Sequence, residues 1–225
     1  MYRKNSYTCK KIIMKIKHTL LFLSLFIIIL FACGPETKEE KLEDLIEVGN
    51  EAKYKSVYTD GKEYNDALVG LDTKINVEVL NLMKLSSVNN IIDNAYSNLN
   101  AEDIKEIREQ IGLIQKEVAS VTEIVQKISC PQDKNNKFKN AALALFSSYN
   151  KCYFENWPLL LNEIEKLHSE EENDVDEAYG RLYDMMMKEQ DLILVVSDAQ
   201  QTFSKEAGFI LSREDHPLDE EFENL

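Results

Sequence analysis

An unbroken apolar seam between Asn100 and Ser129 constrains the fold of this chain more than any other feature. Its members alternate at spacings of three and four residues: Ile104, Ile107, Ile111, Ile114, Val118, Val121, Val125 and Ile128. This spacing places all eight side chains on one face of a helix, as in the a and d positions of a coiled coil. Asn100 suits the N-cap, with Asp103 in the first turn, and Cys130-Pro131 ends the pattern. The segment therefore predicts a long helix that packs along a continuous core.

Three further long stretches carry the same amphipathic spacing. They cover residues 62–94, residues 134–156 with a continuation beyond Pro158, and residues 175–211. Pro158 must kink or restart its helix because proline lacks a backbone N–H and clashes with the preceding turn. A shorter stretch, residues 42–58, predicts one extra helix at the N-terminal side. The predicted fold is all-α, an antiparallel four-helix bundle with a short extra N-terminal helix, within a domain of residues 42–215.

The first 32 residues have the composition of a secretory signal peptide. Residues 19–32 contain no charge, and six Lys or Arg residues precede them. The apolar run has 14 residues, whereas a helix that spans the hydrocarbon of a bilayer needs about 20. A cleaved signal is therefore favoured over a transmembrane anchor. Met14 begins a compact signal of its own, so Met1 and Met14 both remain candidate starts.

Cys33 directly follows Leu30-Phe31-Ala32 and the apolar run, in the arrangement of a bacterial lipoprotein cleavage site. A cysteine in this setting is lipidated on its sulfur, becomes the new N-terminus and is acylated on its amino group. Two or more acyl chains anchor a protein stably. We therefore expect the mature protein to be held to a membrane through the lipid on Cys33, with residues 33–41 as a polar tether.

The mature region is strongly acidic. Six of the 26 basic residues and none of the 40 acidic residues lie before Cys33, which leaves 20 against 40 and a net charge of −20. Nucleic-acid binding depends on neutralising phosphates with Lys and Arg, so this charge argues against a nucleic-acid partner. Residues 216–225 read as an acidic mobile tail.

Cys130 and Cys152 are the remaining thiols of the mature region. A helix that starts near Lys134 places Cys152 about 27 Å along its axis, whereas a disulfide needs Cα atoms within about 7 Å. We expect both to be unpaired, buried small residues, although their oxidation state stays open.

Two clusters are candidates for binding. Tyr149, Tyr153, Phe154 and Trp157 lie within about two helical turns before Pro158. Aromatic residues at this spacing usually fill a core, but at a kink they can form a ligand or partner patch.

The second cluster is Glu165-x-x-His168, one half of the ligand set that a di-metal carboxylate bundle requires. The second Glu-x-x-His is missing from the sequence, so we expect a histidine that closes a helix end, with no metal and no cofactor. The chain also contains no phosphate-binding loop, nucleophile elbow or zinc-protease motif. We therefore do not expect an enzyme.

The tether contains Lys38-Glu39-Glu40, and the first long helix opens with Tyr64-Asn65-Asp66. Together with the cleavage site, these features resemble the small uncharacterised helical surface lipoproteins of Bacteroidetes. That resemblance implies anchorage in the cell envelope, at the outer membrane and exposed on the surface, together with a helical fold. It implies no activity and no site residues. We expect a non-enzymatic bundle that presents its surface to an envelope partner. The alternative is a small-ligand or metal binding module at the kink near Trp157-Pro158.

Overall fold

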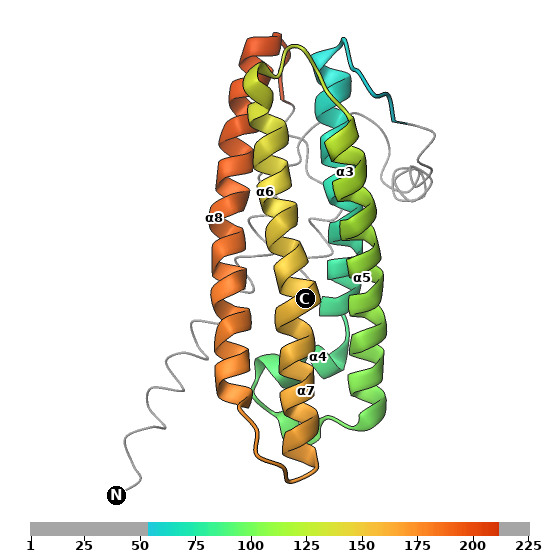
Figure 1. Ribbon diagram of the computed structural model, residues 1–225, viewed down its shortest axis with the longest axis vertical. Coiled ribbons are helices and arrows are strands. Elements are labelled where there is room, and N and C mark those ends of the chain that lie inside the picture. Colours follow the sequence, from blue (N-terminus) through green and yellow to red (C-terminus); the bar gives the residue numbers. More distant parts are fainter. Residues whose placement is uncertain (1–53, 212–225) are drawn as a thin grey trace, which may run out of the picture.

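The computed structural model describes residues 54–211, which form an all-α helical bundle (Figure 1). Cys33, the tether, residues 42–53 of the predicted short helix and residues 212–225 lie outside the described residues. The elements are α3 (Gly61–Met83), α4 (Ser86–Ile92), η2 (Tyr96–Asn98), α5 (Ala101–Lys127), η3 (Lys134–Asn136), α6 (Lys137–Lys151), η4 (Cys152–Asn156), α7 (Trp157–His168) and α8 (Val175–Ala207).

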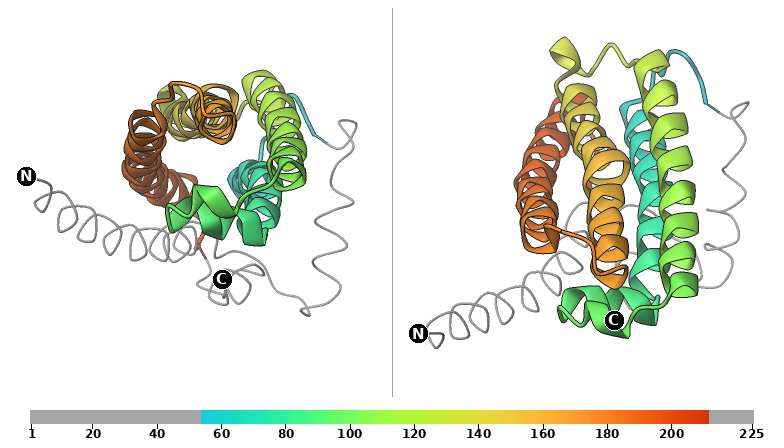
Figure 2. Two further views of the ribbon diagram at one scale, coloured as in Figure 1. Left: turned by 90° about the horizontal axis from the view of Figure 1, so that it is seen from below. Right: turned by 60° about the horizontal axis from the view of Figure 1, so that its bottom comes forward.

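Four long rods run side by side and alternate in direction, with α6, η4 and α7 together making one rod (Figure 1). Seen along the bundle, α3 lies beside α5, α5 beside α6, α6 beside α8, and α8 beside α3, so that α3 and α6 are diagonal (Figure 2). The upper end of Figure 1 joins α5 to α6, and the lower end holds α4 and the connection from α7 to α8. Within residues 54–211, no helix is long and apolar enough to cross a membrane.

Helix α5 confirms the predicted seam. All eight seam residues are buried, and none is more than 3% exposed. Asn100 caps the helix by accepting the backbone N–H groups of Glu102 and Asp103, while the Asp103 side chain accepts the N–H of Asn100. This reciprocal capping satisfies donors that the first turn would otherwise leave unpaired.

The single helix predicted over residues 62–94 is wrong, because the chain breaks after Met83. Lys84 caps α3, Leu85 is extended, and α4 begins at Ser86. Val88 and Ile91 of α4 are 0% and 1% exposed. Burying these two residues under the lower end of the bundle outweighs the continuation of one straight helix.

Residues 54–58, called here the strap, were predicted as the last part of a helix over residues 42–58. They are not helical. The Tyr58 N–H donates to the Ser129 carbonyl at 2.8 Å, and the Ser129 N–H donates to the Ser56 carbonyl at 3.0 Å. These bonds tie the strap to the end of α5. Asp60 then caps α3 by accepting the Glu63 N–H at 3.0 Å.

Helix α6 begins later, and helix α8 ends earlier, than the periodicity alone predicts. Asn135 and Asn136 have left-handed φ values of 61° and 53°, so α6 starts at Lys137 rather than Lys134. Both oxygens of Asp133 then accept backbone N–H groups of the first turn, at 3.0 Å each. At the end of α8, Gly208 takes φ 80° and terminates the helix, as a glycine at this position predicts, since glycine adopts this conformation without a Cβ clash.

Candidate functional site

The predicted aromatic patch is mostly core. Tyr149, Tyr153 and Trp157 are 4%, 4% and 3% exposed, and only Phe154 reaches the surface at 43%. Tyr149 and Tyr153 also contact each other, with ring centres 6.5 Å apart. The four side chains therefore do not gather on one face; three fill the interior, and Phe154 points outward.

A wide π-helical turn, Cys152–Asn156, stands where the sequence predicts a kink. In this turn the Trp157 N–H donates to the carbonyl of Cys152, five residues back. The next bond of that register would join Pro158 to the Tyr153 carbonyl, but proline has no N–H. Gln115 of α5 supplies the missing donor, with its Nε2 2.8 Å from the Tyr153 oxygen. Such turns interrupt helices at functional sites in many proteins.

A buried carboxyl, Glu189 of α8, lies against this turn. Its side chain is 3% exposed and receives a hydrogen bond from the Cys152 thiol. Its Oε1 is buried and finds no hydrogen-bond partner among the described residues. Burial raises the pKa of Glu189 to about 8, because a charged carboxylate is costly in an apolar surround.

Asp72 of α3 is a second interior acid. Its Oδ2 accepts from Asn76 Nδ2 at 2.8 Å, whereas its buried Oδ1 has no partner within the described chain. Burial raises its pKa to about 7, and the bond from Asn76 offsets part of that shift. Gln200 of α8 lies nearby and donates to Asn65 Oδ1 at 2.8 Å.

Asp72 and Gln200 are the polar members of a cavity between α3, α6 and α8, whose other walls are apolar. Its volume is about 20 Å³, enough for roughly one water molecule. Ligand pockets for drug-sized molecules are on the order of 300 Å³ or more. This cavity therefore suits a bridging water rather than a cofactor.

Tyr149 links the two acids electrostatically. Its pKa is raised well above the usual value, first by burial and then by the charges of Asp72 and Glu189. The interior thus holds two acids that bind a proton at neutral pH far more readily than exposed acids do. Cys152 belongs to the same cluster, and burial together with Glu189 raises its pKa as well.

Glu165 and His168 contact separate partners on other elements. Glu165 Oε2 accepts from Arg108 at 2.9 Å, and His168 Nε2 lies 2.8 Å from the Tyr96 carbonyl. His168 is exposed and sits at the last turn of α7, as the helix-closing interpretation predicts. Residues 54–211 contain no group of three or more His, Cys, Asp or Glu that could hold a metal ion.

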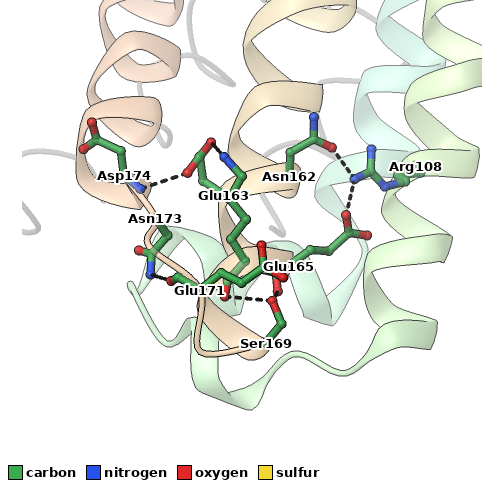
Figure 3. A network of polar contacts seen from close by, with 9 residues as sticks. Arg108, Asn162, Glu163, Glu165, Ser169, Glu171, Asn173 and Asp174 are labelled. Carbon is green, nitrogen blue, oxygen red and sulfur yellow. Dashed lines mark hydrogen bonds and ion pairs between the residues drawn. The ribbon is translucent and has the colours of Figure 1, made fainter.

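Glu165 belongs to a polar network at the lower end of the bundle (Figure 3). Arg108 of α5 also donates to Asn162 Oδ1 at 2.7 Å, which joins α5 to α7. Glu163 accepts from Lys166 at 2.7 Å and from the Asp174 N–H at 2.9 Å, which joins α7 to the start of α8. These bonds lower the pKa of Glu163. The network therefore fixes the acidic connection between α7 and α8.

Sequence reasoning missed the interior acids. Glu189 follows Leu182 and Met186 and precedes Ile193 at spacings of four, three and four, so its position in the apolar stripe was visible. Asp72 follows Leu71 at the edge of its stripe, where periodicity alone cannot separate buried from exposed. The two thiols are free and buried, which confirms that Cys130 and Cys152 do not pair with each other.

No family model, no curated protein and no solved structure matches this chain. Its function is therefore inferred from its own residues and geometry.

Proposed function

We propose that this chain is a lipid-anchored, non-enzymatic protein of the cell envelope whose helical bundle presents its outer surface to an envelope partner. The observation that carries the proposal is Cys33, which directly follows a basic region and a 14-residue apolar run. Such a run is about six residues short of a membrane span. Anchoring through acyl chains leaves the bundle free to use its surface for recognition.

The packing of the bundle supports recognition at the surface. The interior side chains form one continuous core from the upper to the lower end, and the cavity beside Asp72 has room for about one water molecule. Recognition of a large partner by this body would therefore use exposed side chains. Phe154, which lies within the π-turn and is 43% exposed, is one such side chain.

The test of anchoring is the variant Cys33→Ala, expressed with its own leader in a bacterial host. We expect loss of fatty-acid labelling and release from the membrane fraction. Cys9→Ala is the matched control, because it removes a thiol from the same leader and should change neither result. Membrane retention of Cys33→Ala would contradict the proposal and indicate an uncleaved helix.

A second candidate is a small-ligand or metal binding module at the kink. It is favoured by the π-turn beside Glu189, whose Oε1 is buried and without a partner in the described range. Native mass spectrometry and elemental analysis of the purified mature chain separate the two candidates. A bare monomer supports surface recognition, whereas a bound small molecule or metal that Glu189→Gln abolishes supports the binding module.

A further inference from the structure

Five side chains that ionise to anions gather in the interior around η4. They are Asp72, Tyr149, Cys152, Tyr153 and Glu189, and none is more than 6% exposed. Glu189 acts electrostatically on the three members that α6 and η4 contribute, and Asp72 acts on Tyr149. The five groups therefore form one interior cluster, called here the acid cluster.

The acid cluster contains no positive charge that would balance an ionised member. Within the described chain, no Lys, Arg or His is among the groups that shift the pKa values of its members. The ionisable side chains of α7, which also packs against α8, pair elsewhere: Glu163 with Lys166, Glu165 with Arg108, and His168 with the Tyr96 carbonyl. An ionised carboxylate in the cluster would therefore be an uncompensated buried charge.

The two carboxyls also lack the hydrogen bonds that stabilise a carboxylate. Glu189 Oε1 and Asp72 Oδ1 are buried and have no partner in residues 54–211. Glu189 accepts from the Cys152 thiol, which is a weak donor. The packed bundle therefore favours the protonated form of both acids. Ionisation favours any arrangement that lets water reach them.

The π-turn interrupts its rod at the acid cluster. η4 joins α6 to α7 in the rod that runs beside α8 (Figure 1). The Tyr153 carbonyl accepts from the Gln115 side chain because Pro158 supplies no donor, and the Lys151 carbonyl accepts from Asn156 Nδ2 at 3.1 Å. Interruptions of the regular helical bonds are the places where helices bend. The rod can therefore bend here while α6 and α7 stay helical.

We propose that η4 and the facing turns of α8 separate when Glu189 loses its proton, while the rest of the core stays packed. Glu189 is the trigger because it contacts η4 directly through Cys152, whereas Asp72 acts on Tyr149 of α6. Separation breaks the bond from the Cys152 thiol and gives the carboxylate access to water. The bundle therefore contains a switch that is closed at acidic pH and opens at alkaline pH.

The direction of the pH dependence follows from burial. The pKa of Glu189 rises from 4.5 to about 8 in the closed form, whereas water contact in the open form restores the ordinary pKa. The closed form therefore binds a proton that the open form releases. The open fraction should rise about tenfold per pH unit around pH 6 to 7 and level off above about pH 8.

Opening would change the surface that the bundle presents, a consequence that rests on the proposed recognition of an envelope partner. Phe154 lies within the π-turn and is 43% exposed, whereas its neighbour Tyr153 is 4% exposed. Separation of η4 from α8 would add the Tyr153 ring to this surface. The open form would therefore present a larger aromatic area to a partner than the closed form.

The reactivity of Cys152 tests the opening in the mature chain with Cys33→Ala. Cys152 is 1% exposed, so iodoacetamide reaches its thiol only after an opening. Its alkylation rate is measured by peptide mass spectrometry and divided by the rate of a free cysteine peptide at the same pH. The quotient gives the open fraction, which we expect to rise about tenfold from pH 6 to pH 7.

Urea separates local opening from global unfolding. A local opening exposes little surface, so its open fraction changes little in dilute urea, whereas the globally unfolded fraction rises steeply. At pH 8 we expect the open fraction at Cys152 to exceed the globally unfolded fraction from urea denaturation by at least about tenfold. Equal fractions, or an open fraction that follows global unfolding in urea, would overturn the proposal.

Two variants identify the trigger. Glu189→Gln should remove the rise of the open fraction between pH 7 and 8, and Glu106→Gln, at an exposed site on α5, should preserve it. A constant open fraction in the parent chain, or a rise that persists in Glu189→Gln, would overturn the proposal. The parent measurements need no substitution, so they decide the proposal even where Glu189→Gln fails to fold. These tests use unlipidated protein without a partner, so their failure would leave the proposed anchoring and recognition unaffected.

Discussion

Helix α5 and the rod made of α6, η4 and α7 have comparable lengths in the same bundle, but they are stabilised differently. The 27 residues of α5 form one uninterrupted helix whose core positions are all aliphatic. The neighbouring rod covers residues 137–168 and is interrupted by the π-turn before Pro158. Its core positions include Tyr149, Cys152 and Tyr153, and it packs against Glu189.

The difference separates two sources of stability. The seam of α5 depends on the burial of apolar area, which is insensitive to pH and proportional to the surface removed from water. The interrupted rod depends on specific polar partners: Gln115 for a carbonyl that lacks its helical donor, and a proton for Glu189. Substitutions on the two rods should therefore have effects that differ in size and in pH dependence.

The largest expected effect is at the centre of the α5 seam. Ile114→Asp places a charge at a position that is 0% exposed, so we expect a loss of stability on the order of 5 kcal/mol, enough to unfold the bundle. Leu113→Asp is the matched control, since Leu113 is next to Ile114 in the chain and is 48% exposed. Urea unfolding followed by circular dichroism checks both variants. Equal stability of Ile114→Asp and the parent would show that the seam faces solvent.

The interior acids predict a pH dependence that the α5 seam lacks. The pKa of Glu189 rises from 4.5 to about 8 on folding, so the folded protein holds a proton that the unfolded chain releases. The contribution of Glu189 to the free energy of unfolding should therefore be greatest below about pH 4.5. It should fall as the pH rises to about 8 and stay constant above that. At about 1.4 kcal/mol per pKa unit, the fall is on the order of 3–5 kcal/mol.

Glu189→Gln should reduce the slope of this pH profile and remove the part between about pH 7 and 8, because glutamine keeps the shape and does not titrate. Asp72→Asn should remove a similar slope between about pH 4 and 7, where the raised pKa of Asp72 operates. Glu106→Gln, at an exposed site on α5, is the control and should leave the profile unchanged. Thermal melts from pH 4 to 9 test all three. A slope between about pH 7 and 8 that persists in Glu189→Gln would exclude this carboxyl as its source.

A smaller effect is expected at the contact between the two rods. Gln115→Ala removes the donor to the Tyr153 carbonyl, and a polar group left unpaired costs about 1–3 kcal/mol. Gln126→Ala on the exposed side of the same helix is the control for helix propensity. Chemical denaturation should show a clear loss for the first variant and almost none for the second. Equal losses would mean that the bond contributes nothing of its own.

The smallest expected effect is a coupling between Gln115 and Pro158. Pro158→Ala restores a backbone N–H that can reach the Tyr153 carbonyl, so Gln115→Ala should become less costly in that background. We expect a coupling energy of about 1 kcal/mol in a double-mutant cycle. Additive effects would show that the missing proline donor does not explain the role of Gln115.

A region can be predicted from sequence when its interactions join residues that are close together in the chain. The seam of α5 repeats a local spacing, so the sequence predicts its boundaries within two residues and its buried face completely. The break after Met83 was missed because it depends on the burial of Val88 and Ile91 beneath other helices. The partner of the Tyr153 carbonyl lies 38 positions away in the chain, where no local pattern identifies it.

The candidate sites show the same division. Periodicity predicts that Tyr149, Tyr153 and Trp157 lie in one helical region, but only the packed structure separates them from the exposed Phe154. Cys33 and the tether lie outside the described residues, so their interpretation still depends on sequence.

The most direct test of the central proposal is the mass of the mature N-terminus. The full chain with its native leader would be expressed in a bacterium, extracted from membranes with detergent and measured by intact mass spectrometry with sequencing of its N-terminal peptide. Lipid anchoring predicts a chain that begins at Cys33, has a blocked amino group and carries acyl chains on sulfur. A chain that retains residues 15–32, or one with an unmodified Cys33, would contradict it.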